Sequence, residues 1–405
     1  MDLKLIPAAF LACMHVANVS YALTSNETVS RHARELHARS IVIDTHDDTT
    51  QRFIFDSFDL GHLDQSGSID IPRMRAGGMN GIFFSVWMPG TVTGPAAVKR
   101  ALQQIYAIRK QVRLHPDQLE LCTTAQQVRD THTKGKIAVL MGVEGGHMIN
   151  HDLAVLRQYA KLGVRYMTLT HSVNTEWADS STDKPEHDGL TAFGRHVVLE
   201  MNKLGMMIDI SHVSDKTFYD ALAVSQAPMI ASHSSCRSIC NAPRNMSDKM
   251  IKALADKGGV IQINYHLGFL SQEYRNAAAK SRELAALDKQ VKLNCGDNEA
   301  CYIIGLEAIS RKLVKAGKLP VVQWDKIIDH IDHVVKLAGV DHVGLGSDFD
   351  GANMPFGMED ASHLPQITQA LIDRGYSDSD IQKILGGNIL RVMQAAETTA
   401  RRLQG

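Results

Sequence analysis

The segment IAVLMGVE, at residues 137–144, is a short apolar run with branched side chains that ends in a single carboxylate, Glu144. Such a run is typical of a parallel strand, because both faces of a parallel sheet are covered and the strand needs no polar alternation. Seven similar runs alternate with amphipathic stretches along the chain. They are Ile41–His46, Gly81–Trp87, Tyr166–His171, Met206–His212, Met229–His233, Val260–Tyr265 and Val343–Asp348. The pattern predicts an α/β fold, a (β/α)8 TIM barrel.

The stretches between these runs have helical periodicity, and the last gap is unusually long. The clearest helical patterns lie at 96–114, 153–162, 190–204 and 248–257. Residues 268–324 exceed the length of one crossover, and their helical patterns predict a helical insertion between strands seven and eight. Two or three helices after Asp348 close the chain. A doubly wound open sheet is the alternative, but no glycine-rich phosphate loop follows the first strand.

Composition allows a large core and argues against one class of partner. The chain has 405 residues, of which 44% are hydrophobic and 21% charged, with a net charge of −1. No Lys/Arg run suggests the basic surface of a nucleic-acid-binding protein. Barrels of this length form one domain, and no linker is evident, so we expect a single hydrolase domain over residues 23–405.

The first 22 residues have the pattern of a secretory signal. Lys4 precedes the apolar stretch Leu5–Val19, and small residues lead to a cleavage position after Ala22. We therefore expect an exported protein, periplasmic or secreted. Lipidation at Cys13 fits less well, because the apolar stretch continues beyond it. No other segment reaches the ~18 apolar residues of a membrane span.

Five cysteines follow this segment, and two of them lie close together in a polar loop. Cys295 and Cys301 enclose the sequence GDNEA, and an exported protein favours their pairing. Cys122, Cys236 and Cys240 remain, and the odd total leaves at least one free thiol in a monomer. None has the CxxC spacing of a cysteine-ligated zinc site.

The ends of six predicted strands carry histidine or carboxylate side chains. A single such histidine is more often structural, but the C-terminal strand ends of a barrel meet at one mouth, where active sites lie. Imidazoles and carboxylates hold zinc-like ions that activate water, and the two oxygens of Glu144 can bridge two cations. The pattern predicts a metal-dependent active site at the mouth, where these side chains converge: His46, Asp48, Glu144, His171, His212, His233 and Asp348.

Longer motifs around these residues resemble the membrane (renal-type) dipeptidase family. The likeness runs in the expected order from about residue 41 to 395. It rests on IDTHDD (43–48), DIPRMRAGG (70–78), VEGGH (143–147), LTHSVNT (169–175), ISHVS (210–214), SHSS (232–235), RN (244–245), GSDFDG (346–351) and GNILR (387–391). The resemblance implies a zinc-dependent dipeptidase with two Zn2+ per chain, dipeptide substrates that include L-D pairs, and a homodimer.

The resemblance also implies the metal ligands. His46 and Asp48 would bind one zinc, His212 and His233 the other, and Glu144 would bridge them. A hydroxide held between the two metals would attack the peptide carbonyl.

The remaining roles concern the substrate. His171 would stabilise the oxyanion, Arg244 would bind the C-terminal carboxylate, and Asp348 would pass a proton from the water to the leaving amine. Tyr265 or Asn264 would add a substrate contact.

Some questions stay open at this point. Asp47 stands where the family commonly has Asn, and it either strengthens metal binding or only hydrogen-bonds the backbone. Arg237 competes with Arg244 as the carboxylate-binding residue, and His147 is more readily structural than a ligand. Another binuclear metallo-amidohydrolase, or a biosynthetic tailoring protein acting on a non-dipeptide amide, is the alternative function.

Overall fold

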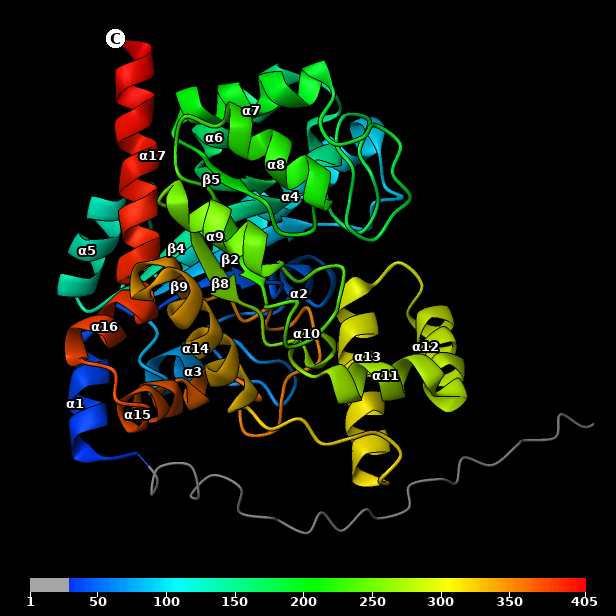
Figure 1. Ribbon diagram of the computed structural model, residues 1–405. Helices are drawn as coiled ribbons and strands as arrows, with labels where there is room; N and C mark the ends of the chain where they lie inside the picture. The colour runs from blue at the N-terminus through cyan, green and yellow to red at the C-terminus, as the bar shows by residue number, and fades with distance from the viewer. Residues whose placement is uncertain (1–28) are drawn as a thin grey trace, which may run out of the picture.

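The eight predicted strands form one parallel barrel in the computed structural model, which describes residues 29–405 (Figure 1). Neighbouring strands pair in the order β1-β2-β4-β5-β6-β7-β8-β9. Their bounds are β1 (Ile43–Asp47), β2 (Gly81–Trp87), β4 (Ile137–Glu144), β5 (Val164–Thr168), β6 (Met207–Asp209), β7 (Ile230–Ser234), β8 (Val260–Ile263) and β9 (Val343–Leu345). The predicted fold class is confirmed.

The barrel closes where its first and last strands end. The Asp48 amide donates to the Phe349 carbonyl at 2.9 Å, and the Asp348 amide donates to the His46 carbonyl at 3.1 Å. These bonds link the segments that follow β1 and β9, so residues from the two ends of the sequence meet at one edge of the mouth.

A further strand, β3 (Leu119–Leu121), pairs with β4 outside the barrel and was not predicted. Four predicted strands also end earlier than expected, at Thr168, Asp209, Ile263 and Leu345. His171, His212 and Asp348 therefore lie in the loops beyond β5, β6 and β9.

Helices surround the barrel and agree with the predicted periodicity. Polar caps and glycines define their ends: Thr124 and Gln127 form a capping box, and Gly163 ends a helix at φ 108°. The crossover helices are α4 (Gly94–Leu114), α5 (Ala125–Thr133), α6 (Leu153–Leu162), α7 (Ala192–Leu204), α8 (Asp215–Val224), α9 (Asp248–Asp256) and α14 (Lys326–Ala338).

The predicted insertion between the last two strands is helical, as expected. It consists of α10 (Leu267–Leu270), α11 (Gln272–Lys280), α12 (Arg282–Cys295) and α13 (Glu299–Lys315), which project to one side of the barrel in Figure 1. The disulfide Cys295–Cys301 closes the turn between α12 and α13, and this pairing is confirmed. Cys122, Cys236 and Cys240 are buried free thiols.

The remaining helices come from the first and the last parts of the described chain, before β2 and after β9. They are α1 (Arg31–Arg39), α2 (Thr50–Phe55), α3 (Ile71–Ala76), α15 (Pro365–Asp373), α16 (Asp378–Gln382) and α17 (Asn388–Gln404). Ile389 and Met393 of α17 join the apolar cluster that contains Ile43 and Phe83 of the barrel.

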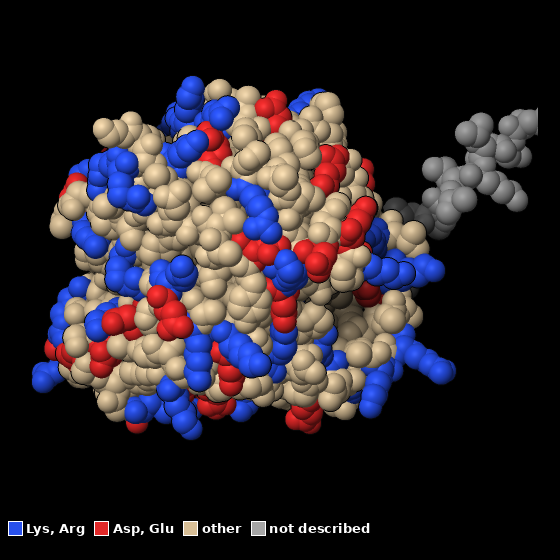
Figure 2. All heavy atoms as spheres, turned by 45° about the horizontal axis from the view of Figure 1, so that its top comes forward, with Lys and Arg blue, Asp and Glu red and all other residues tan. Residues whose placement is uncertain are grey.

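The described part of the chain contains no helix with the length and apolarity of a membrane span. On the face shown in Figure 2, acidic and basic side chains are interspersed. The expected signal segment, residues 1–22, lies outside the described residues.

Candidate metal centre

Glu144, at the end of β4, lies between two sets of imidazoles. Its Oε2 atom is 3.5 Å from Nε2 of His46, at the end of β1. Its Oε1 atom is 2.8 Å from Nε2 of His212 and 3.2 Å from Nε2 of His233. Oε2 thus faces His46, whereas Oε1 faces His212 and His233, which is the arrangement that a ligand shared by two cations requires.

Further donors complete the cluster around Glu144. Asp48 Oδ1 lies 3.4 Å from His46 Nε2, and Asp348 Oδ1 lies 4.0 Å from it. On the other side, His171 Nε2 is 3.8 Å from Glu144 Oε1. The ligand atoms form three overlapping groups, each within 4.8 Å: His46–Glu144–His233, Glu144–His171–His212 and His46–Asp48–Asp348.

The chemistry of these buried donors fits divalent cations. His46 Nε2 and Asp48 Oδ1 are buried and have no hydrogen-bond partner among residues 29–405. The Nε2 atoms of His212 and His233 lie only 3.0 Å apart. Burial alone would raise the pKa of Glu144, but the surrounding histidines hold it well below its ordinary value. An ionised carboxylate among converging nitrogens is a donor set suited to zinc.

Hydrogen bonds at Nδ1 orient two of the imidazoles, those of His46 and His233. Nδ1 of His46 lies 2.9 Å from the Tyr166 hydroxyl, and Nδ1 of His233 lies 2.8 Å from Oγ of Ser232. Ser232 Oγ donates in turn to Asp209 Oδ2 at 2.6 Å. Partners on Nδ1 leave Nε2 free to bind a metal and fix the direction of the ring. Sequence reasoning missed these residues, because Tyr166 and Asp209 lie inside apolar strand runs.

The backbone is strained at two residues of the cluster. His212 has φ +68° and Asp348 has φ +67°, a region that non-glycine residues rarely adopt. Such strain persists only where neighbouring contacts enforce it, and it is common at functional sites. The Ser181 amide donates to the His212 carbonyl at 2.7 Å and holds that turn.

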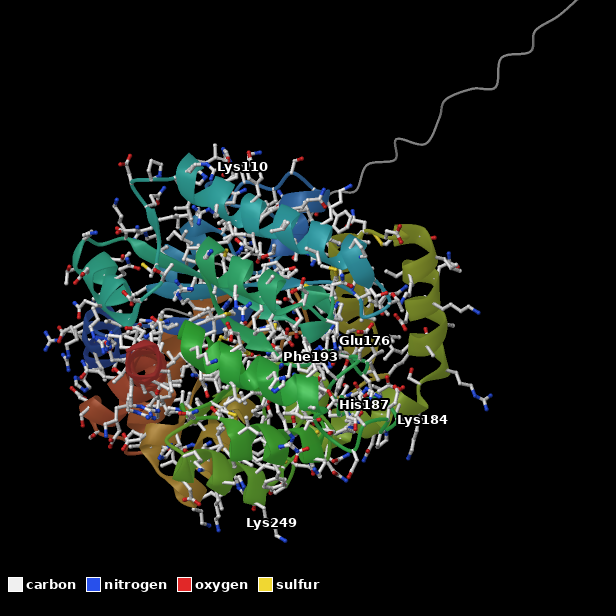
Figure 3. All side chains as sticks on the ribbon, turned by 90° about the horizontal axis from the view of Figure 1, so that it is seen from above. Lys110, Glu176, Lys184, His187, Phe193 and Lys249 are labelled. Atoms are coloured by element: carbon white, nitrogen blue, oxygen red, sulfur yellow. A yellow bond between two sulfur atoms is a disulfide. The ribbon has the colours of Figure 1, made fainter. Side chains whose placement is uncertain are left out.

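The loop between β5 and α7 contacts the backbone of two residues of the cluster. Ser180 Oγ donates to the His171 carbonyl at 2.6 Å and lies 3.2 Å from the His212 carbonyl. Asp179 accepts hydrogen bonds from three later amides of the same loop, which makes the loop a compact unit. Figure 3 shows its residues Glu176, Lys184 and His187 grouped on one side of the molecule.

The cluster forms the floor of a cleft with a cavity of about 380 Å³. Its polar floor is faced by apolar and charged side chains from the helical insertion and from the loop after β2. The lining comprises Asp48, Trp87, Pro89, Glu144, His171, Ser172, His212, His233, Arg244, His266, Phe269, Lys292, Glu299, Tyr302, Ile303, Leu306, Asp348, Gly351, Ala352 and Asn353.

Arg244 is the arginine that reaches this cleft. Its Nη2 donates to the His233 carbonyl at 3.0 Å, its guanidinium lies 5.4 Å from the Phe269 ring centre, and its buried Nε has no partner among the described residues. Arg237 instead forms two hydrogen bonds with Asp215, at 2.8 and 2.7 Å. The geometry therefore favours Arg244 as the anion-binding residue.

The structure places His266, rather than Tyr265, at the cleft. Tyr265 is fully buried beneath it, with its ring against Phe349 at 5.8 Å. His266 lines the cleft with Phe269, and its buried Nδ1 lacks a partner among residues 29–405. Burial and nearby Arg244 lower the pKa of His266 to about 4, so the ring is neutral. No motif in the sequence identified His266 as a residue of the cleft.

Asp348 faces the cleft as a candidate proton carrier. Asn264 Nδ2 donates to its Oδ2 at 2.9 Å. Burial raises its pKa above the ordinary value, which helps a carboxylate accept and release a proton. Asn264 therefore positions Asp348.

Asp47 points away from the cleft lining. It accepts hydrogen bonds from the amide and the hydroxyl of Thr49, each at 3.1 Å. His147 likewise lies outside the three ligand groups and lines a separate small cavity with Trp177. The geometry favours a structural role for both residues.

The chain is similar to known dipeptidases over most of its length. The family model described as membrane dipeptidase (peptidase family M19) matches residues 30–405. Dipeptidase 3 of Mus musculus is 34% identical over 345 residues, covering 84% of this chain. The match spans 60% of that relative's length.

Two solved structures share the fold. The probable dipeptidase PvdM from Pseudomonas aeruginosa matches with a TM-score of 0.77 and 30% identity, over 91% of this chain and 98% of that one. A metallopeptidase from Rhodobacter sphaeroides, liganded with a phosphinate mimic of the dipeptide L-Ala-D-Ala, matches with a TM-score of 0.71 and 25% identity, over 88% and 99%.

Proposed function

Because this chain belongs to the membrane dipeptidase family of metallopeptidases, we propose that it hydrolyses the peptide bond of dipeptides at the mouth of its barrel. The observation that carries the proposal is the position of Glu144, whose two oxygens face separate imidazole sets. Arg244 lines the same cleft and offers a cation for a substrate carboxylate. A shared metal ligand beside an anion-binding residue suits a small substrate with a free carboxyl end.

We propose that two zinc ions occupy the cluster. His46 and Asp48 would hold one, His212 and His233 the other, and Glu144 would contact both. When bound, such ions lower the pKa of water toward ~7 and polarise a carbonyl group. The neutral imidazoles needed for this role are favoured by burial, which lowers the pKa of His212 and His233 well below the ordinary value.

The other cleft residues would bind the substrate and move the proton. Arg244 would bind the terminal carboxylate, beside the neutral ring of His266. His171 would donate a hydrogen bond to the carbonyl oxygen as negative charge develops on it. Asp348, held by Asn264, would accept a proton from the attacking water and deliver it to the leaving amine.

We propose that the substrate is a short molecule, because Arg244 and Glu144 line the same cleft of about 380 Å³. Residues of the helical insertion line this cleft as well. A substrate of two residues would place its carboxylate on Arg244 and its peptide bond over Glu144. The ligand of the Rhodobacter sphaeroides metallopeptidase supports including L-D pairs among the substrates to test.

We further propose that the protein is exported after removal of residues 1–22, leaving one hydrolase domain over 23–405. The disulfide Cys295–Cys301 supports an oxidising compartment. N-terminal sequencing of the protein from fractionated cells tests the cleavage position, and retention of an intact N-terminus inside the cell would contradict it. Light scattering tests the homodimer that the resemblance implies.

Hydrolysis of one L-L and one L-D dipeptide by the purified protein tests the function. We expect chelation to abolish turnover of the L-L pair, and about two zinc ions per chain to restore it. Turnover that survives complete metal removal would overturn the metal-dependent mechanism. No turnover of any dipeptide by protein with two bound zinc ions would overturn the dipeptidase assignment and favour another amide as substrate.

A further inference from the structure

The helical insertion presents three apolar side chains to the cleft, beside the charged Lys292 and Glu299. Tyr302, Ile303 and Leu306 occupy positions i, i+1 and i+4 of α13, so they share one side of the helix. All three line the cleft and remain partly exposed to solvent. Burying partly exposed apolar side chains of an enzyme cleft against an apolar group of a ligand lowers the free energy of binding.

This face lies across the barrel from Arg244. The strand order places three strands between β2 and β7 in either direction, so the loops after β2 and β7 are opposite each other. Trp87 ends β2, whereas Arg244 follows β7. The start of α13 is on the β2 side, because Asn298 Nδ2 donates to Asp56 Oδ1 at 3.4 Å, just after α2. Trp87 and the first turns of α13 thus lie at the side of the cleft opposite Arg244.

Internal contacts hold this wall in place. The Cys295–Cys301 disulfide joins α12 to α13, and the Tyr302 hydroxyl donates to Asp288 Oδ1 at 2.8 Å. Tyr274 of α11 hydrogen-bonds Ser310 of α13 at 2.7 Å. The wall is therefore a preformed surface rather than a free loop, as a selective pocket requires.

We propose that Tyr302, Ile303 and Leu306, together with Trp87, form the pocket for the side chain of the substrate's N-terminal residue and select large apolar side chains there. The inference rests on the proposed dipeptidase function. With the terminal carboxylate on Arg244 and the peptide carbonyl over Glu144, the N-terminal residue extends toward the opposite wall. Its side chain then meets α13, whereas the C-terminal side chain lies near Phe269 and His266.

Two substrate pairs separate the ends of the cleft. Leu-Ala and Gly-Ala vary the N-terminal side chain, and Ala-Leu and Ala-Gly vary the C-terminal one. We expect kcat/KM of the wild-type protein to be at least about tenfold higher for Leu-Ala than for Gly-Ala, the usual effect of filling an apolar pocket.

Two α13 variants and two matched controls test the residues. Leu306→Ala should lower the Leu-Ala/Gly-Ala ratio about threefold, and Ile303→Asp should lower it further, toward equal rates for the two substrates. Leu293→Ala, at a side chain 70% exposed on α12, and Ala308→Asp, on the exposed side of α13, should leave the ratio unchanged. Circular dichroism and zinc content establish that each variant is folded, and Leu306→Ala suffices if Ile303→Asp fails to fold.

The outcomes distinguish this inference from the proposed function. Dipeptide hydrolysis with an unchanged Leu-Ala/Gly-Ala ratio in folded Leu306→Ala would overturn the pocket but keep the dipeptidase. A change confined to the Ala-Leu/Ala-Gly ratio would also overturn it, because α13 would then contact the C-terminal residue. Wild-type protein that binds zinc but cleaves none of the four dipeptides would overturn both.

Discussion

The hydroxyl of Tyr166 lies 2.9 Å from Nδ1 of His46 inside the barrel. Burial raises the pKa of this phenol, so it stays neutral and can accept the Nδ1 hydrogen while Nε2 faces the metal centre. Gly142 leaves the space for this ring, since a Cβ atom there would lie 1.9 Å from Tyr166 Cζ. Tyr166 is thus built into the wall of the metal centre.

We expect Tyr166→Phe to weaken zinc binding by about 10- to 100-fold, the usual effect of removing such a partner. Competition with a chromophoric chelator measures the affinity. Tyr159→Phe is the matched control, because its buried hydroxyl donates to the Met148 carbonyl at 2.7 Å and not to a ligand. Equal zinc affinities for the two variants would contradict the role given to Tyr166.

The metal centre could be predicted from the sequence because a barrel places the C-terminal ends of all its strands at one mouth. His46, Glu144 and His233 lie far apart in the chain, yet each belongs to a strand whose C-terminal end reaches the mouth. Apolar runs identified those strands, and the motifs around the ligands identified the family. The helical insertion followed from the length and periodicity of its segment.

The residues that position the proposed ligands and line the cleft could not be predicted, because they occur in no periodic sequence pattern. The loop that carries Ser180 is ordered by side chain–backbone hydrogen bonds, which leave no repeating pattern in the sequence. Tyr265 was expected at the cleft from the resemblance alone. The strand β8 ends at Ile263, so Tyr265 and His266 lie in the irregular segment beyond it, where strand alternation does not fix the direction of a side chain.

Arg244 should matter far more for substrates with a free carboxylate than for substrates without one. We expect Arg244→Ala to lower kcat/KM for a dipeptide by 100-fold or more, since a hydrogen bond to a charged group is lost from a buried site. The corresponding dipeptide amide should lose less than about threefold. Arg237→Ala is the control, because that side chain is already bound to Asp215. Steady-state kinetics on both substrates tests this, and equal losses would contradict carboxylate binding by Arg244.

Ser180 should affect turnover more than substrate binding. Its hydroxyl contacts the carbonyls of both His171 and His212, so its loss frees the backbone at one proposed oxyanion-stabilising residue and one proposed ligand. We expect Ser180→Ala to lower kcat about tenfold with KM nearly unchanged, because small displacements reduce transition-state stabilisation. Ser181→Ala is the control, since that buried hydroxyl has no partner among the described residues. A pure loss of thermal stability, with kcat intact, would refute the positioning role.

His330 should make the stability of the protein dependent on pH. It is fully buried on α14, where Nδ1 accepts from the Cys236 amide at 3.0 Å and Nε2 donates to the Leu270 carbonyl at 3.2 Å. Burial lowers the pKa of His330 to about 4, against about 6.5 in an unfolded chain. Between these values the unfolded state binds one more proton than the native state. The free energy of unfolding therefore falls as the pH drops from about 6.5 to 4, by about 1.4 kcal/mol per pH unit for this group.

His330→Gln keeps a donor and an acceptor but cannot bind the proton. We expect it to destabilise the protein at neutral pH. Between pH 6.5 and 4, we expect it to reduce the slope of the unfolding free energy against pH by about 1.4 kcal/mol per pH unit, the contribution of one proton. Urea unfolding at several pH values gives the slope, and the difference from wild type removes the contribution of the metal centre, which both proteins share. His62→Gln, at an imidazole 82% exposed, should leave the slope unchanged. Identical slopes for His330→Gln and wild type would contradict the prediction, because His330 would then bind its proton as readily in the native state as in the unfolded chain.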